Sequence, residues 1–224
     1  MRRLAAAWPL LLFACHAPAP PPESPLDRAI PAILQREGIP GAVVLLGGPE
    51  GTTYLRAFGE ARLDTVWDLA SCTKVVATTT AAMKLVEDGK LGLHDRVSKH
   101  LRVFEGRDIT VEELLTHRSG LPAYLSPKAE WSQDEILHRI AELKVSKDFR
   151  YSCLNMISLA RVVEELTGRP LADYCRETIF EPLGMKDTGF APTASRCAAT
   201  APDVAAGTVH DPLARAYGSP LHRP

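Results

Sequence analysis

The chain has 224 residues, of which 46% are hydrophobic and 24% charged, and its net charge at neutral pH is -1. This is the composition of a globular protein with enough apolar side chains for one core. A near-zero charge without a long basic run gives no electrostatic basis for binding nucleic acid, so small molecules or neutral polymers are the expected partners.

Residues 1–15 have the pattern of an export signal. Arg2 and Arg3 precede the apolar run LAAAWPLLLFA, which is too short to span a bilayer as a permanent helix. The run ends in LFAC, which resembles the lipobox of bacterial lipoproteins. Cys15 is therefore the candidate for lipidation, with a plain secretory signal as the alternative. We expect export to the bacterial cell envelope, periplasm or outer membrane, with membrane contact through a lipid anchor if Cys15 is modified.

The proline-rich segment of residues 16–24 predicts an extended, semi-rigid tether, and residues 25–224 are expected to form one domain. The domain opens with a predicted helix from Pro25 to Glu37, capped by Ser24 and stopped by Gly38. Pro31 is expected to bend or divide this helix. The segments GAVVLLG and TTYLRAFG then predict two strands around a turn at GPEG.

From Ser71 to Gly89 the pattern is helical, with Val75, Met83 and Val86 as candidates for the buried face. Capping boxes at TVEE and SQDE open two shorter helices, and two amphipathic segments follow, LNMISLARVVEELTG and PLADYCRETIF. Two strands followed mostly by helices predict an α+β fold rather than a repeat protein or a parallel βαβ array.

Four cysteines remain after Cys15, and they are Cys72, Cys153, Cys175 and Cys197. An even number in an oxidising compartment allows three pairings, but free buried thiols explain the same residues equally well.

Ser71 and Lys74 lie three residues apart and would share one face at the start of a helix. A serine hydroxyl becomes a good nucleophile when a base takes its proton, and a lysine amine can do so in its neutral form, which burial and the positive end of a helix favour. By spacing alone the pair is weak support, because Ser71 also suits an N-cap and Lys74 a solvated charge.

The surrounding sequence is more specific. DLASCTKVVATTTAAMKLVEDGKL closely resembles the nucleophile region of the serine β-lactamase-related family, which includes class C β-lactamases, D-alanyl-D-alanine carboxypeptidases and related esterases. The resemblance runs from about residue 30 to residue 211. It continues through IPGAVVLLGG, LGLHDRVSKHL, ITVEELLTHRSGLPAY, YSCLNMISLARVVEELTGRPL and IFEPLGMKDTGF. It implies a β-lactamase/transpeptidase-like fold, with a helical subdomain beside an antiparallel sheet that this chain leaves incomplete.

The resemblance also implies roles for single residues. Ser71 would be the acylated nucleophile, Lys74 its proton partner, and Tyr151 a base or proton relay that opens the YxN motif. Without its neighbours, Tyr151 would be read as a half-buried core aromatic. Cys153 stands where the family usually has Asn or Asp to orient substrate, and a thiol cannot copy an amide. We hypothesise that Cys153 bonds to Cys72.

His117 resembles the histidine of the family's LLTHTSGL segment, and we interpret it as a buried, hydrogen-bonded structural residue rather than a catalytic base. No cofactor is expected. No metal is expected either, because His94, His100 and His210 lack ligand spacing with Cys or carboxylates.

The family's third motif, Lys or His followed by Thr or Ser and then Gly, does not occur in this sequence. We expect a truncated member that lacks the closing strands of its sheet and one oxyanion-hole donor, and that is therefore of low stability and activity.

Two functions remain. The first is a serine hydrolase that forms an acyl-enzyme on Ser71 from an ester, amide or β-lactam carbonyl of a small-molecule or peptidoglycan-like substrate. The alternative is a non-catalytic envelope lipoprotein that retains part of the fold as a binding module. A purely structural helical scaffold explains neither Lys74 nor the YSCLN segment.

Overall fold

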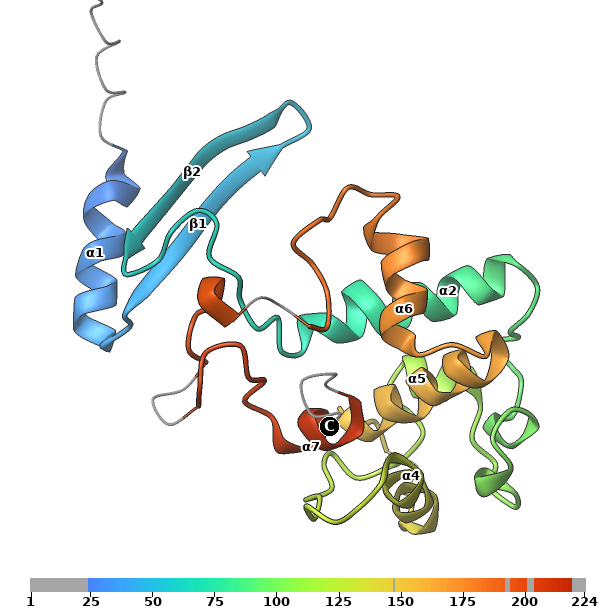
Figure 1. The fold of residues 1–224 in the computed structure, drawn as a ribbon. Helices are drawn as coiled ribbons and strands as arrows, with labels where there is room; N and C mark the ends of the chain where they lie inside the picture. Colours follow the sequence, from blue (N-terminus) through green and yellow to red (C-terminus); the bar gives the residue numbers. More distant parts are fainter. Residues whose placement is uncertain (1–23, 147, 192–193, 201–203, 219–224) are drawn as a thin grey trace, which may run out of the picture. The chain divides into compact units, whose positions relative to one another are not determined.

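The structure is a computed structural model that describes residues 24–146, 148–191, 194–200 and 204–218 (Figure 1). The chain divides into two compact units, Met1–Leu63 and Asp64–Pro224. The described part of the first holds a helix and a two-stranded antiparallel sheet, and that of the second is helical. The predicted α+β class is confirmed. The expected export signal and all of the tether except Ser24 lie outside the described residues.

Helix α1 (Pro25–Glu37) has the boundaries that the sequence predicts. The Ser24 side chain accepts a hydrogen bond from the first turn, and the Asp27 carboxylate accepts one from the Ser24 backbone N–H at 2.7 Å. Gly38 ends the helix with φ 64°, a left-handed conformation that glycine adopts without strain. Pro31 lies inside the helix and does not divide it.

Strands β1 (Gly41–Gly48) and β2 (Gly51–Gly59) form the predicted hairpin, with Pro49 and Glu50 in its turn. The sheet of the described chain has these two strands only. Asp27 of α1 joins the helix to β2, because its carboxylate accepts the Tyr54 hydroxyl at 2.6 Å and pairs with Arg56 at 3.0 Å. These bonds lower the pKa of Asp27, the Tyr54 hydrogen bond most strongly.

The second unit contains six α-helices and several short 3-10 and π segments in its described residues. The α-helices are α2 (Thr80–Glu87), α3 (Val111–Leu115), α4 (Gln133–Glu142), α5 (Cys153–Thr167), α6 (Leu171–Cys175) and α7 (Pro212–Gly218). The other segments are η1 (Lys74–Thr79), η2 (Val97–Lys99), η3 (Arg102–Phe104), η4 (Arg176–Phe180) and η5 (Ala194–Arg196). In the described residues, no helix is long and apolar enough to cross a membrane.

Helix α5 forms the centre of this unit and packs against η1, α2, α3, α4 and α6. Ser152 caps its first turn, and Gly168 ends it in the left-handed conformation. Leu154, Leu159 and Val162 on its inner side are fully buried. Burial of each such side chain contributes about 1.5–3 kcal/mol, so this helix holds the unit together.

The two predicted capping boxes differ. Thr110 caps α3 with both reciprocal bonds, and the Glu113 carboxylate accepts the Thr110 N–H at 2.8 Å. Ser132 caps α4 with its side chain, but the Glu135 carboxylate accepts a hydrogen bond from Arg139 at 2.8 Å instead.

The buried face of the η1–α2 helix is not the predicted one. Val75 and Met83 are 67% and 61% exposed in the described chain, whereas Val86 packs partly against the core. The residues that are buried are small or one step out of phase: Ala77, Thr78, Ala81, Ala82 and Leu85. These positions follow the ordinary helical period of about 3.6 residues. The prediction was wrong about which apolar residues face the core, because the small Ala77, Ala81 and Ala82 pack there and the larger Val75 and Met83 do not.

Candidate active site

The segment before Ser71 is a strained turn. Ala70 has φ 46°, a left-handed conformation that is costly for a residue with a β-carbon. Three successive bonds then run from the N–H groups of Cys72, Thr73 and Lys74 to the carbonyls three residues earlier. This tight turn exposes Ser71 at the entrance to η1, and unusual backbone of this kind is concentrated at functional sites.

Asp68 holds the turn in place. One carboxylate oxygen accepts the Ala70 N–H at 2.8 Å, and the other accepts the His210 backbone N–H at 3.4 Å and pairs with His210 Nδ1 at 3.1 Å. Burial alone would raise the pKa of Asp68, but the hydrogen bonds from Ala70 and His210 outweigh it and lower the pKa. The charged carboxylate is therefore the form that fits this turn.

Lys74 Nζ lies 3.0 Å from Ser71 Oγ. The two residues occupy the same face of the first turn, as their spacing predicts, and the distance suits proton transfer between a hydroxyl and an amine. The enclosure that we expected around the pair is not present in the described chain, because Ser71 is exposed and Lys74 is only half-buried.

Tyr151 is the third side chain of the cluster. Lys74 Nζ lies 5.2 Å from the centre of the Tyr151 ring, within the range of a cation–π attraction. The contact is with the ring face, and no described residue bonds to the Tyr151 hydroxyl. Tyr151 as a whole residue is 48% exposed, so a substrate can reach it. The structure thus brings together Ser71, Lys74 and Tyr151, which the sequence nominated as a group.

His117 supports the Tyr151 ring from another side. The two ring centres are 4.6 Å apart at an angle of 45°. His117 has φ 57°, and its carbonyl accepts the Arg150 N–H at 3.0 Å, which fixes the chain immediately before Tyr151. Burial, and then the charge of Lys74, lower the pKa of His117. The predicted hydrogen-bonded role of His117 agrees with this geometry, although its side chain is half-buried rather than buried.

A buried asparagine orients that histidine. Asn155 Nδ2 lies 3.0 Å from His117 Nδ1, and the Ser152 N–H donates to the same nitrogen at 3.3 Å. The Ser119 hydroxyl donates to Asn155 Oδ1 at 2.5 Å. Because Nδ1 accepts from two donors, the proton of the neutral imidazole must lie on Nε2.

The four described cysteines are free thiols, so the hypothesis of a Cys72–Cys153 disulfide is wrong for this structure. Cys72 is exposed beside the nucleophile. Cys153 begins α5, and its N–H donates to the Ala123 carbonyl at 2.9 Å, whereas its thiol makes no hydrogen bond to a described residue. The two positions are fixed by backbone turns and helix starts, not by a covalent bond. Cys15 lies outside the described residues.

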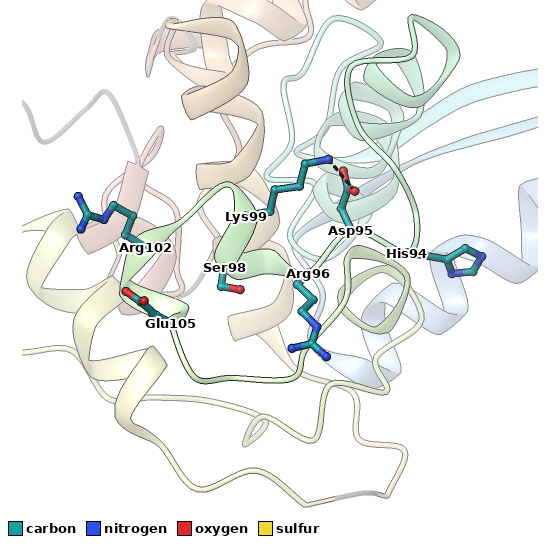
Figure 2. Close-up of a pocket in the computed structure, with 7 residues that line it drawn as sticks. All are labelled: His94, Asp95, Arg96, Ser98, Lys99, Arg102 and Glu105. Carbon is teal, nitrogen blue, oxygen red and sulfur yellow. Dashed lines mark hydrogen bonds and ion pairs between the residues drawn. The ribbon is translucent and has the colours of Figure 1, made fainter.

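No group of three potential metal ligands occurs among the residues that the structure describes. An open hollow of about 540 Å³ lies elsewhere in the second unit, between η2, η3 and the preceding loop. Its lining residues are His94, Asp95, Arg96, Ser98, Lys99, Arg102 and Glu105 (Figure 2). Figure 2 shows that only Lys99 and Asp95 meet, while the other side chains point apart. The hollow has no convergent set of groups and shares no residue with the Ser71 cluster.

Sequence reasoning missed three residues at the site: Asn155, Asp68 and His210. Asn155 carried a usable signal, because an amide on the apolar face of a predicted helix needs a buried partner. The hydrogen bond between Asp68 and His210 carried no usable sequence signal, because it joins positions 142 residues apart.

The helices and the antiparallel hairpin, together with this cluster, define a protein with a β-lactamase/transpeptidase-like fold. The chain belongs to the Beta-lactamase family, because the sequence model of that family matches residues 26–220.

Among curated relatives, the chain is similar to an N-acetylmuramyl-L-alanine amidase of Bacillus subtilis (strain 168), with 33% identity over 166 residues, which cover 64% of this chain and 37% of the relative. Among solved structures, it is similar to the D-amino acid amidase from Ochrobactrum anthropi SV3, with 30% identity and a TM-score of 0.65 over 79% of this chain and 56% of the other. A class C beta lactamase from Rhodobacter sphaeroides shares the fold at 22% identity, with a TM-score of 0.72 over 86% of this chain and 60% of the other. The chain spans 37% to 42% of the length of the first curated relatives.

Proposed function

We propose that the chain carries the nucleophile of a serine hydrolase that forms an acyl-enzyme on Ser71. The observation that carries the proposal is the 3.0 Å distance between Lys74 Nζ and Ser71 Oγ at an exposed, strained turn. Membership of the Beta-lactamase family supports it, and so do a curated relative and a solved structure that are both named as amidases.

The reaction has two stages. The Ser71 hydroxyl loses its proton to the neutral amine of Lys74 while Oγ bonds to the substrate carbonyl carbon. The leaving group then departs with a proton returned from Lys74, directly or through the Tyr151 hydroxyl. A water molecule next attacks the ester on Ser71, which releases the carboxylic acid and restores the hydroxyl. The substrate is an ester, amide or β-lactam carbonyl.

The Ser71 backbone N–H is one donor for the oxyanion that forms in both stages. The N–H of Ala70 is used by Asp68, but the N–H of Ser71 has no hydrogen-bond partner among the described residues. A donor that is already oriented and unpaired stabilises a developing oxyanion, and loss of one such donor typically costs about 10²–10³ in rate.

Covalent labelling tests the proposal. A fluorophosphonate or a labelled penicillin should attach to the peptide that contains Ser71, and Ser71→Ala should abolish the label. Lys74→Ala should slow labelling while Ser71 stays present. Ser98→Ala, at a serine outside the cluster, serves as the matched control and should label normally. Labelling that persists in Ser71→Ala would contradict the proposal.

The alternative is a non-catalytic binding module. One observation favours it: the Cys153 thiol makes no hydrogen bond to a described residue at a position where the family usually has an amide or carboxylate. In that case, the folded protein would take no label but would sediment with peptidoglycan sacculi, and Ser71→Ala would sediment equally well.

We also propose that the protein acts in the cell envelope on a small-molecule or peptidoglycan-like substrate, held by a lipid on Cys15. The apolar run before LFAC supports export. Metabolic labelling with a fatty-acid analogue should mark the wild-type protein and leave Cys15→Ala unmarked. Wild-type protein that stays unmarked would contradict the lipid anchor and favour the alternative, a plain secretory signal.

A further inference from the structure

His210 holds the nucleophile turn from a distant part of the sequence. Its backbone N–H and its ring Nδ1 both reach the same oxygen of Asp68, at 3.4 Å and 3.1 Å. The other oxygen of Asp68 holds the N–H of Ala70, the left-handed residue before Ser71. His210 therefore contacts the group that keeps the nucleophile turn in its strained shape.

The next residue, Asp211, holds the other side of the cluster. Its carboxylate accepts the Tyr124 hydroxyl at 3.2 Å and the Leu213 N–H at 2.8 Å, which anchors it at the start of α7. The loop before Tyr124 in turn fixes the chain after Tyr151. The Pro122 carbonyl accepts the Ser152 hydroxyl at 2.5 Å, and the Ala123 carbonyl accepts the Cys153 N–H at 2.9 Å.

We propose that His210 and Asp211 are positioning residues that hold Ser71 at a fixed position relative to Tyr151. His210 binds the turn that carries Ser71, and Asp211 binds the loop that holds the chain following Tyr151. The two adjacent residues thus form a clasp across the cluster. This inference rests on the proposed function, because the relative position of Ser71 and Tyr151 matters when a proton passes between them.

The contacts of the clasp lie outside the hydrophobic core, so packing of the core does not account for them. The His210 side chain is 50% exposed, and the Tyr124–Asp211 bond lies at the surface. Removal of either side chain leaves no cavity of the kind that a core substitution creates. Its effect should therefore fall on the position of Ser71 rather than on global stability.

The test compares His210→Ala with His210→Asn in the full chain, with His138→Ala as the control at an exposed histidine of α4. Asparagine keeps a side-chain N–H donor near the place of Nδ1. We expect His210→Ala to acylate Ser71 about 10- to 100-fold more slowly, since misplacement by about 1 Å costs that much. His210→Asn should recover most of the rate, and His138→Ala should match the wild type.

Amide hydrogen exchange supplies a second measurement that does not need activity. Exchange at Ala70 should accelerate in His210→Ala, while the thermal midpoint stays close to that of the wild type. A double-mutant cycle with Tyr124→Phe should show non-additive losses in acylation rate, because both bonds belong to one clasp.

The outcomes separate the two proposals. A wild-type protein that takes no label at Ser71 removes the proposed function, and the clasp is then decided by exchange at Ala70. Unchanged exchange in His210→Ala overturns the clasp, as does a normal acylation rate. An equal loss in His210→Asn and His210→Ala also overturns it, because the ring donor would then not be what matters.

Discussion

Asn155 donates a hydrogen bond of 3.0 Å to Nδ1 of His117, and the same nitrogen accepts the Ser152 N–H. Two donors on one nitrogen hold His117 neutral with its proton on Nε2. Burial and the charge of Lys74 also lower the pKa of His117, which favours the same neutral form. The residue that contacts the Tyr151 ring is therefore an uncharged imidazole, which adds no positive charge beside Lys74.

Asn155→Asp should reverse that state. The change replaces a donor with a carboxylate acceptor, so protonated Nδ1 gains a partner and the pKa of His117 should rise by about 1 or more. An NMR titration of the His117 ring measures it. Ser119→Ala is the matched control, because it removes the partner on the other side of Asn155 without adding charge and should shift the His117 titration less. A His117 titration that is the same in Asn155→Asp and wild type would show that the bond does not set the protonation state.

Tyr151→Phe should separate the ring of Tyr151 from its hydroxyl. Phenylalanine keeps the 4.6 Å contact with His117 and the 5.2 Å contact with Lys74 Nζ, since both are made by the ring. If the hydroxyl relays a proton, the acylation rate should fall by about 10²–10⁴-fold with little change in the thermal midpoint. Tyr151→Ala removes the ring as well and should also loosen His117. A wild-type acylation rate in Tyr151→Phe would show that the hydroxyl relays no proton and that Tyr151 acts only through the contact of its ring with Lys74.

Local signals explain why the sequence predicted α1 with its boundaries and the two strands of the hairpin to within one residue at the turn. Ser24, Asp27 and Gly38 act through bonds to residues within a few positions, so their effect is visible in a short window. The pairing of Ser71 with Lys74 was predictable for the same reason, because a single helical turn brings them together.

Features that depend on packing or on distant segments were not predictable in this way. The exposure of Val75 and Met83 depends on which side of the η1–α2 helix packs against α5, and small alanines rather than the larger apolar residues form that side. Cys72 and Cys153 share a site by resemblance, yet the structure leaves both thiols free. The attachment of Asp68 to His210 depends on how the chain returns to the nucleophile turn after residue 200, and sequence spacing does not encode that return.

The free thiols should differ strongly in reactivity. Burial raises the pKa of Cys175 to about 12, so very little of the reactive thiolate forms near neutral pH, whereas Cys72 is exposed. Brief treatment of the folded protein with iodoacetamide should alkylate Cys72 and leave Cys175 intact, and peptide mass spectrometry reports both. In denaturant the two should react alike, which provides the control. Equal alkylation of Cys72 and Cys175 in the folded protein would mean that Cys175 is not held in the core.

Asp95 should make the second unit sensitive to acid. Its carboxylate accepts Lys99 Nζ at 2.8 Å and the Gly92 N–H at 3.0 Å, and it pairs with His100 at 3.1 Å. The Lys99 hydrogen bond is the largest cause, and together these contacts lower the pKa of Asp95 from 3.8 to about 2. A carboxyl whose pKa is lower in the folded state stabilises the fold at every pH above the pKa that the group has in the unfolded chain. That contribution decreases as the pH falls from 3.8 towards about 2.

Asp95→Asn should therefore reduce the free energy of unfolding at neutral pH and flatten its dependence on pH over the same window. Denaturant unfolding at a series of pH values, followed by circular dichroism, measures both effects. Asp148→Asn is the matched control, because Asp148 is exposed and makes no hydrogen bond or ion pair with any described residue. Its curve should parallel that of the wild type, whose remaining acid sensitivity comes from carboxylates such as Asp68. If Asp95→Asn and Asp148→Asn gave the same pH profile, the bonds from Lys99 and Gly92 would contribute nothing to acid stability, since only Asp95 makes them.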